Sequence, residues 1–348
     1  MTPDWRTFLI QAGAVLAGER VQHFGDPEQE RRAAAGGAVL CDLSGQGLIA
    51  AAGPDTETFL QGQLTNDVRQ VTPARSQLSA CCNPRGRMLA SVRLFLREAV
   101  YYLRLPQETV EPLRQHLQRF ILRARVTLRD ASEELARIGL SGPAADDLLQ
   151  EALGAAPAQV DNVVQTPGFT VIRVPGVHPR WEIYGLPAAM PPLWTLLAAK
   201  ARPAGAEAWR LLDILAGVPN IYPETAEAFV PQMVNLQLIN GVSFNKGCYT
   251  GQEVVARTQH LGTLKRRMYR AHIDAVPAPR PGDGLFSEEL GGGAGHIVDA
   301  CEGPSGGCEV LAVVAIDAAE SGAVRWRGEG GPRLQLAPLP YPWGNAIR

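Results

Sequence analysis

The chain has 348 residues, with 33 Lys and Arg against 35 Asp and Glu, so its formal net charge is −2 at pH 7. This length exceeds one ordinary hydrophobic core and predicts two or three domains. The near-neutral charge excludes a general polyanion-binding protein, and 46% hydrophobic with 20% charged residues excludes wholesale disorder.

The beginning of the chain predicts an amphipathic helix, because apolar side chains recur at helical spacing at Trp5, Phe8, Leu9, Ala12 and Leu16. Asp4 and Gln11 interrupt what a signal peptide would keep apolar. The longest purely apolar run, 310–316, is far too short to cross a membrane. We therefore expect a cytoplasmic protein with no membrane partner.

The next region predicts a mixed layer of strands and helices. A helix opens at 54–57, and a β-hairpin is expected from strands 77–82 and 87–95 around the turn 83–86. A third strand at 99–105 extends this meander, and the apolar period of 107–121 predicts a helix packed on it.

A second α+β lobe is expected further on. Residues 169–174 and 180–184 alternate like strands, and a short helix from Trp209 to Leu215 ends at Gly217. Beyond residue 264 the pattern is that of a small antiparallel barrel or sandwich, with strand-like runs at 265–273, 294–301, 309–316 and 333–338. A domain boundary is therefore expected near residue 262.

The six cysteines, at 41, 81, 82, 248, 301 and 308, include no Cys-x-x-Cys pair and are expected to be reduced thiols. The histidines are too scattered to predict a metal site.

The densest chemical signal is the stretch 245–258. Glycines at 247 and 251 surround Cys248, and residues after Gly251 can form a short helix on which Glu253 and Arg257 lie four residues apart. Cys248 would precede a helix N-terminus and stand two residues from Lys246, and both features stabilise a thiolate. The alternative is that Cys248 is a small buried apolar residue. A single cysteine cannot hold an iron–sulfur cluster, so any cluster would need additional ligands.

The sequence KGCYTGQE at 246–253 resembles the signature of the YgfZ family, the folate-binding relatives of the glycine-cleavage T-protein that serve iron–sulfur protein maturation and tRNA modification. The resemblance extends to 53–55 and 59–68, to the turn 82–88, to 209–237 and to 338–341. It implies two interleaved α+β lobes around a central channel, plus a C-terminal antiparallel β-barrel domain. The expected domains are 1–135, 136–262 and 263–348.

The same resemblance implies a tetrahydrofolate-type ligand in the channel. Trp209 falls at one of two tryptophan positions associated with that ligand, whereas 43–47 contains no counterpart of the other. Stacking of a pterin on the indole is one interpretation of Trp209, and simple core packing is the other. Five further residues complete the expected folate-binding set, with Arg87 of the turn available to the glutamate tail. Three belong to the motif, one follows it and one lies in the turn: Tyr249, Gln252, Glu253, Arg257 and Arg87.

The T-protein's own transfer reaction is not expected here. Its turn leads into adjacent aspartates, one of which is tied to catalysis, and the corresponding residues of this chain are Ala90 and Ser91. Without that carboxylate, the charge that would stabilise a cationic intermediate is missing.

We therefore expect a folate-binding protein that supports iron–sulfur protein assembly or repair and thereby tRNA modification, with Cys248 as the functional thiol and Lys246 beside it. Its partners would be folate and iron–sulfur assembly proteins or client enzymes. One alternative is a folate-dependent one-carbon transferase with an altered acceptor. Another is a tRNA-binding module using the basic run 265–270, which a solvated strand edge would also explain.

Overall fold

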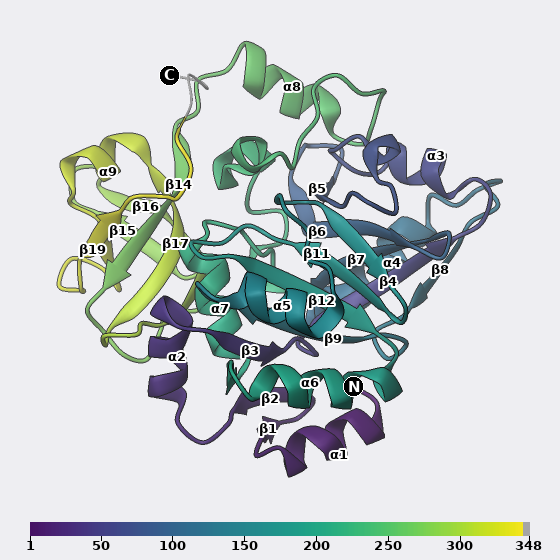
Figure 1. Ribbon diagram of the computed structural model, residues 1–348. Helices are drawn as coiled ribbons and strands as arrows, with labels where there is room; N and C mark the ends of the chain where they lie inside the picture. Colours follow the sequence, from purple (N-terminus) through teal and green to yellow (C-terminus); the bar gives the residue numbers. More distant parts are fainter. Residues whose placement is uncertain (344–348) are drawn as a thin grey trace. The chain divides into compact units, whose positions relative to one another are not determined.

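The computed structural model describes residues 1–343 (Figure 1). The chain divides into two compact units, and each is assembled from segments that alternate along the sequence. The first unit contains Met1–Thr56, Arg69–Gln77 and Arg93–Leu212. The second contains Glu57–Val68, Leu78–Val92 and the chain from Asp213 onward. Helices and strands mix in both units, so the predicted α+β class is confirmed, whereas the predicted boundaries at 135 and 262 stay a prediction.

The α-helices of the described chain are α1 (Pro3–Gln11), α2 (Pro27–Gly36), α3 (Thr56–Gln61), α4 (Gln107–Gln118), α5 (Ala145–Leu153), α6 (Met190–Ala198), α7 (Ala206–Leu215), α8 (Gln252–His260) and α9 (Ile316–Ser321). Short 3₁₀ turns are η1 (Val68–Gln70), η2 (Pro187–Ala189), η3 (Pro223–Thr225), η4 (Pro231–Val234) and η5 (Leu236–Ile239).

The first unit contains a six-stranded sheet with the order β10-β11-β12-β9-β3-β13. Its strands are β3 (Val39–Asp42), β9 (Ala136–Ser141), β10 (Val163–Thr166), β11 (Phe169–Arg173), β12 (Arg180–Gly185) and β13 (Arg202–Ala204). A small hairpin, β1 (Val15–Ala17) with β2 (Arg20–His23), precedes it. Helices α1 and α6 lie side by side below this sheet (Figure 1). Their apolar faces meet in one core, where the rings of Trp5 and Trp194 pack edge to face at 5.8 Å.

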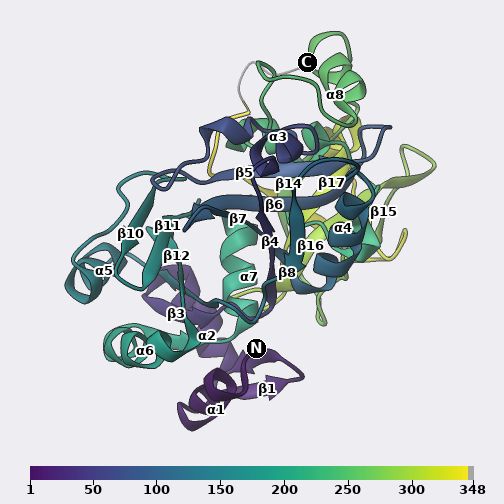
Figure 2. The ribbon, with the colours of Figure 1, turned by 90° about the vertical axis from the view of Figure 1, so that its right-hand side faces the viewer.

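A five-stranded sheet has the order β5-β6-β7-β4-β8. Its strands are β4 (Gln46–Ala52), β5 (Gln77–Cys82), β6 (Met88–Arg97), β7 (Val100–Pro106) and β8 (Thr127–Asp130). The predicted meander is thus confirmed. Helix α4 packs on β4, β7 and β8 because Val110, Leu113 and Leu117 form one buried stripe, which confirms the predicted helix–sheet contact (Figure 2).

The C-terminal region of the second unit is a six-stranded antiparallel sheet with the order β18-β15-β16-β17-β14-β19. The strands are β14 (Arg266–Ile273), β15 (Gly284–Ser287), β16 (Gly292–Glu302), β17 (Cys308–Ala315), β18 (Arg325–Trp326) and β19 (Leu334–Ala337). The sheet curls round an apolar core, and its two end strands meet: Leu334 N donates to Val324 O at 2.9 Å, and Trp326 N to Pro332 O at 2.9 Å. This agrees with the predicted barrel.

The basic run 265–270 lies mostly in β14, which pairs with β17 on one side and β19 on the other. The pairing with β19 covers only Arg270–Ile273, so Arg266 and Arg267 have a neighbouring strand on the β17 side alone. The expectation of a solvated strand edge for 265–270 therefore stays a prediction. Within residues 1–343, no helix combines the length and the apolar character needed to cross a membrane.

Candidate functional site

Residues 245–251, which we call the thiol loop, lead directly into α8 in the second unit. Gly251 occupies the N-cap position of α8 with φ +85°, a left-handed conformation that favours glycine. The predicted helix after Gly251 is confirmed and extends to His260. Glu253 and Arg257 are both exposed on it.

Cys248 is exposed, whereas the other five cysteines are buried. Burial raises the pKa of the Cys81 thiol to about 12 and raises those of Cys41 and Cys82 as well. The thiols of Cys41, Cys81 and Cys82 therefore stay protonated at neutral pH, and burial shields all five from solvent. Because Cys248 is exposed, its interpretation as a buried apolar residue is excluded. The thiol loop presents the accessible cysteine of the chain to solvent.

Lys246, two residues earlier, is buried and points its ammonium group into the turn after α3. Nζ donates to Gln61 O at 2.8 Å, Leu64 O at 2.6 Å and Asn66 O at 2.8 Å. Nζ also lies 5.0 Å from the centre of the Tyr249 ring. Since an ammonium group has three N–H bonds, these three carbonyl groups account for its donors. Lys246 fastens the loop to the turn, a role that the sequence did not predict.

The motif residues after Cys248 are hydrogen-bonded to the first residue of α8 and to the turn after α3. Tyr249 N donates to Gln252 Oε1 at 3.3 Å, and Gln252 N donates to Tyr249 O at 3.1 Å. Thr250 N donates to Gly62 O at 3.2 Å. The Tyr249 ring is largely buried, and this burial raises its pKa, so its hydroxyl stays protonated at neutral pH.

The turn between β5 and β6 abuts the other side of Gly251. Asn83 Oδ1 accepts hydrogen bonds from Arg85 N at 2.9 Å and Arg87 N at 3.1 Å, which holds the turn closed. The guanidinium group of Arg87 donates to Ala228 O at 2.7 Å. The structure thus brings together three segments that the resemblance had marked separately, 61–66, 83–87 and 246–252.

Trp209 belongs to α7 in the first unit and is 2% exposed. The guanidinium carbon of Arg180 lies 3.9 Å from the centre of the indole, and the ring packs against Gly139, where a Cβ would collide with it. The faces of the indole are therefore covered by protein, as core packing predicts. Its buried Nε1, however, has no hydrogen-bond acceptor within the described chain.

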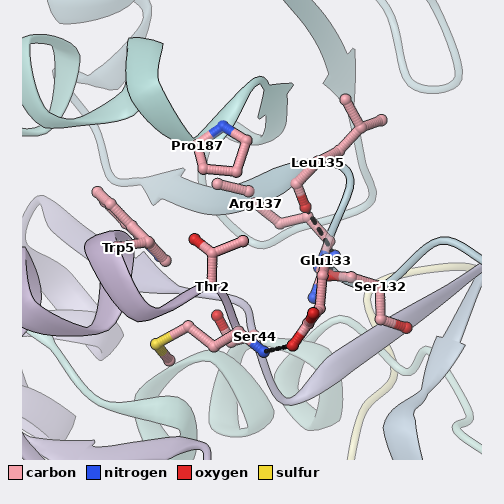
Figure 3. A pocket seen from close by; sticks show the side chains of 10 residues that line it. Thr2, Trp5, Ser44, Ser132, Glu133, Leu135, Arg137 and Pro187 are labelled. Atoms are coloured by element: carbon pink, nitrogen blue, oxygen red, sulfur yellow. Dashed lines mark hydrogen bonds and ion pairs between the residues drawn. The ribbon is translucent and has the colours of Figure 1, made fainter.

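A hollow of about 180 Å³, which includes open solvent, lies in the first unit near the N-terminus (Figure 3). Its lining includes Thr2, Trp5, Ser44, Arg137 and Pro187, and none of the predicted site residues. Pockets that bury a cofactor-sized ligand usually enclose roughly 300–1,000 Å³. In residues 1–343, no three His, Cys, Asp or Glu side chains gather closely enough to hold a metal ion.

At the two positions that correspond to the T-protein aspartates, Ala90 is fully buried and Ser91 Oγ accepts a hydrogen bond from Ile221 N at 3.2 Å. Neither side chain supplies a carboxylate.

Thr65 and Asn66 bind the segment that leads into the thiol loop, a role that the sequence did not predict. Their hydrogen-bond partners there lie 174 or more residues away in the chain, so no local pattern indicates the role.

Residues 11–246 match the GCVT N-terminal domain. The whole fold is similar to a crystal structure of the glycine cleavage system aminomethyltransferase T from Bartonella henselae, with a TM-score of 0.77 and 18% identity, covering 100% of this chain and 99% of that one. The class defined here is therefore the T-protein fold.

Two relatives specify the family further. One, named tRNA-modifying protein YgfZ, from Colwellia psychrerythraea, is 34% identical over 281 residues, which cover 80% of this chain and 86% of that protein. The protein of the same name from Pectobacterium carotovorum is 31% identical over 306 residues, covering 87% and 91%. The chain belongs to the YgfZ family.

Proposed function

We propose that this protein binds a tetrahydrofolate-type ligand and supports the assembly or repair of iron–sulfur proteins, and thereby tRNA modification, with Cys248 as the acting thiol. The observation that carries the proposal is the exposed Cys248 on a loop fastened on both sides. A buried thiol or a loose surface loop would not present sulfur to a partner in a defined position. The relatives are named tRNA-modifying protein, and this name supports tRNA modification as the process that the protein serves.

The thiol acts on a partner or a ligand supplied from outside. One cysteine provides one ligand, and clusters normally need four, so cluster chemistry at Cys248 requires thiols from a client protein or small molecules. The ammonium of Lys246 is bound by carbonyl groups, so its contribution is to hold the loop rather than to donate a proton. The exposed position of Cys248 favours a macromolecular client over a small substrate that needs a closed pocket.

Tetrahydrofolate would supply a carrier of one-carbon groups. The T-protein fold supports this part of the proposal. Stacking on Trp209 does not fit, because Arg180 and Gly139 cover the indole. The Nε1 donor does fit a hydrogen-bond acceptor of the ligand, since it is buried without a partner. Arg257 is an exposed cation suited to a carboxylate tail.

The two alternative functions are less well supported. Ala90 and Ser91 offer no carboxylate for one-carbon transfer. Of the basic run, Arg267 lies over the Trp343 ring at 4.9 Å, and Arg270 Nε lies 3.5 Å from Glu309 Oε2. Because these two guanidinium groups contact side chains of the C-terminal region itself, they argue against a tRNA-binding strand.

The thiol is tested by complementation of a strain that lacks the protein. Cys248→Ser and Cys248→Ala are expected to fold normally and to fail to restore thiolated tRNA. Asn245→Ala, an exposed change in the same loop, is the matched control and is expected to restore it. Full restoration by both cysteine variants would remove the thiol from the mechanism.

The ligand is tested by calorimetric titration with tetrahydrofolate. Trp209→Phe keeps an aromatic ring but removes the N–H donor, and losing one neutral hydrogen bond should weaken binding by about threefold to tenfold. A silent titration with the unaltered protein would refute folate binding and leave the thiol proposal standing.

A further inference from the structure

The segment leading into the thiol loop is bonded to the turn 61–66 at three points besides Lys246. Thr65 Oγ1 donates to Gly241 O at 2.8 Å, and Ser243 N donates to Thr65 O at 3.0 Å. Asn66 Nδ2 donates to Asn240 O at 2.6 Å. Turn and loop segment therefore form one hydrogen-bonded assembly within the second unit.

Thr65 also reaches in the opposite direction, toward strand β5. It is fully buried, and its Oγ1 accepts a hydrogen bond from Ala80 N at 2.9 Å. The hydroxyl thus connects the backbone of β5 with the carbonyl of Gly241. A valine at this position would fill the same space and break both connections.

Asn66 makes a parallel connection. Its Nδ2 donates to Leu78 O in β5 at 2.9 Å as well as to Asn240 O, while its Oδ1 accepts from Asp67 N. Asn240 has φ +59°, a left-handed conformation that an L-residue adopts at a cost. The amide of Asn66 therefore holds a carbonyl group at the strained bend where the chain turns toward Cys248.

We infer that Thr65 and Asn66 are positioning residues of the thiol site. Each side chain is hydrogen-bonded both to β5 and to the segment before the thiol loop, and so restricts the motion of the loop that presents Cys248. This inference rests on the proposed function for its biological meaning. The mechanical link itself is independent of that function, because it connects named backbone groups. Loss of either side chain releases the loop without removing the sulfur.

The chain provides its own probe of this link, since Cys248 is exposed and the other five cysteines are buried. A nitroxide spin label attached to the native protein will therefore report on the thiol loop. The variants are Thr65→Val, which removes the hydroxyl, and Thr65→Ser, which keeps it. Thr109→Val is the matched control, because Thr109 is a buried threonine of α4 whose Oγ1 bonds to Pro106 O at 2.7 Å in the other unit.

The spectrum of the labelled native protein is expected to show a restricted label, and Thr65→Ser should preserve it. Of the hydrogen bonds that Thr65→Val removes, the one to Gly241 O holds the loop segment. Its loss should raise the mobile fraction about fivefold, the factor by which one buried hydrogen bond shifts a local equilibrium. Thr109→Val should leave the spectrum unchanged even where it lowers the unfolding temperature equally. An unchanged spectrum in Thr65→Val, or equal mobility in Thr109→Val, would overturn the inference.

Asn66→Ala gives a second, independent variant, measured below its unfolding temperature with the same label and expected to show the same mobile component. Complementation then separates the two proposals. A mobile loop in Thr65→Val together with normal tRNA thiolation would uphold the mechanical link and refute the need for a positioned thiol. A rigid loop with lost thiolation would refute the link and leave the thiol proposal intact.

Discussion

Gly251 and Gly86 face each other so closely that neither has room for a side chain. A Cβ on Gly251 would lie 3.0 Å from the Gly86 Cα and 2.5 Å from Asn83 O, and a Cβ on Gly86 would lie 2.9 Å from Val254 Cβ. Both residues also have positive φ, at +85° and +69°. The hairpin turn and the start of α8 therefore depend on two glycines from segments far apart in the sequence.

Gly251→Ala is predicted to destabilise the protein and displace the thiol loop. The left-handed conformation alone costs about 1–2 kcal/mol for a residue with a Cβ, and the collision with Asn83 O adds to it. Urea unfolding measures the loss. Gly247→Ala is the control, because no atom lies within 4 Å of a Cβ there and its φ is not positive. Equal stability of the two variants would contradict the close packing of Gly251 and Gly86.

Lys246→Met is predicted to lower the free energy of unfolding by about 3 kcal/mol, because it leaves buried carbonyl groups without their charged donor. Lys200→Met provides the comparison, since the Lys200–Glu151 ion pair is more than half exposed and such pairs contribute little. Chemical denaturation of both variants is the measurement. A similar small effect for both would show that the three carbonyl bonds do not stabilise the fold.

Thiol counting provides a prediction about the native state. A disulfide reagent such as dithionitrobenzoate should modify one thiol per folded chain rapidly, and all six after denaturation. The rapid phase should vanish in Cys248→Ser. Two or more rapidly reacting thiols in the folded wild-type protein would contradict the burial of the other five.

The ionisation of the buried Glu182 carboxyl makes the free energy of unfolding depend on pH. Burial acts to raise the pKa of this carboxyl, but the guanidinium groups of Arg104 and Arg93 outweigh it and lower the pKa. The unfolded chain therefore binds the proton more tightly than the folded one. The stability contributed by Glu182 is present above its unfolded pKa of about 4.3 and is lost as pH falls through the lower folded value.

Glu182→Gln should accordingly cost about 3–5 kcal/mol at pH 7, where it leaves the buried Arg104 without its carboxylate. The difference from wild type should shrink on acidification below pH 4, because the variant lacks this titration. Urea unfolding at a series of pH values measures it. Glu111→Gln, which removes an exposed partner of Arg114, should have a far smaller effect at pH 7. A difference that is constant with pH would refute the assignment.

Local patterns in the sequence were sufficient to predict several elements of both units. The turn residues 83–86 predicted the β5–β6 hairpin, and the apolar period predicted α4, because both depend on neighbours in the chain. Helix α2 was missed although its signal is present: Asp26 caps Gln29 N, and Pro27 follows at the first helical position.

The roles of individual side chains were less predictable. Lys246 was expected to act on the neighbouring sulfur, yet its ammonium group binds carbonyl groups 180 or more residues earlier in the chain. The basic run 265–270 was also open to a tRNA-binding role, but Arg267 lies over the Trp343 ring and Arg270 Nε lies 3.5 Å from Glu309 Oε2. In each case the deciding partner is distant in sequence, so spacing alone contains no information about it.

The long stretch of sequence between the turn 61–66 and Lys246 also has a consequence during synthesis of the chain. The carbonyl group of Asn66 is made 180 residues before the ammonium group that binds it. At 5–20 residues per second, this delay is on the order of 10–35 s. During that interval the carbonyl groups of the turn lack the donor that binds them in the folded protein and are hydrogen-bonded by water instead. This part of the second unit can therefore reach its final structure only after the thiol loop has been made.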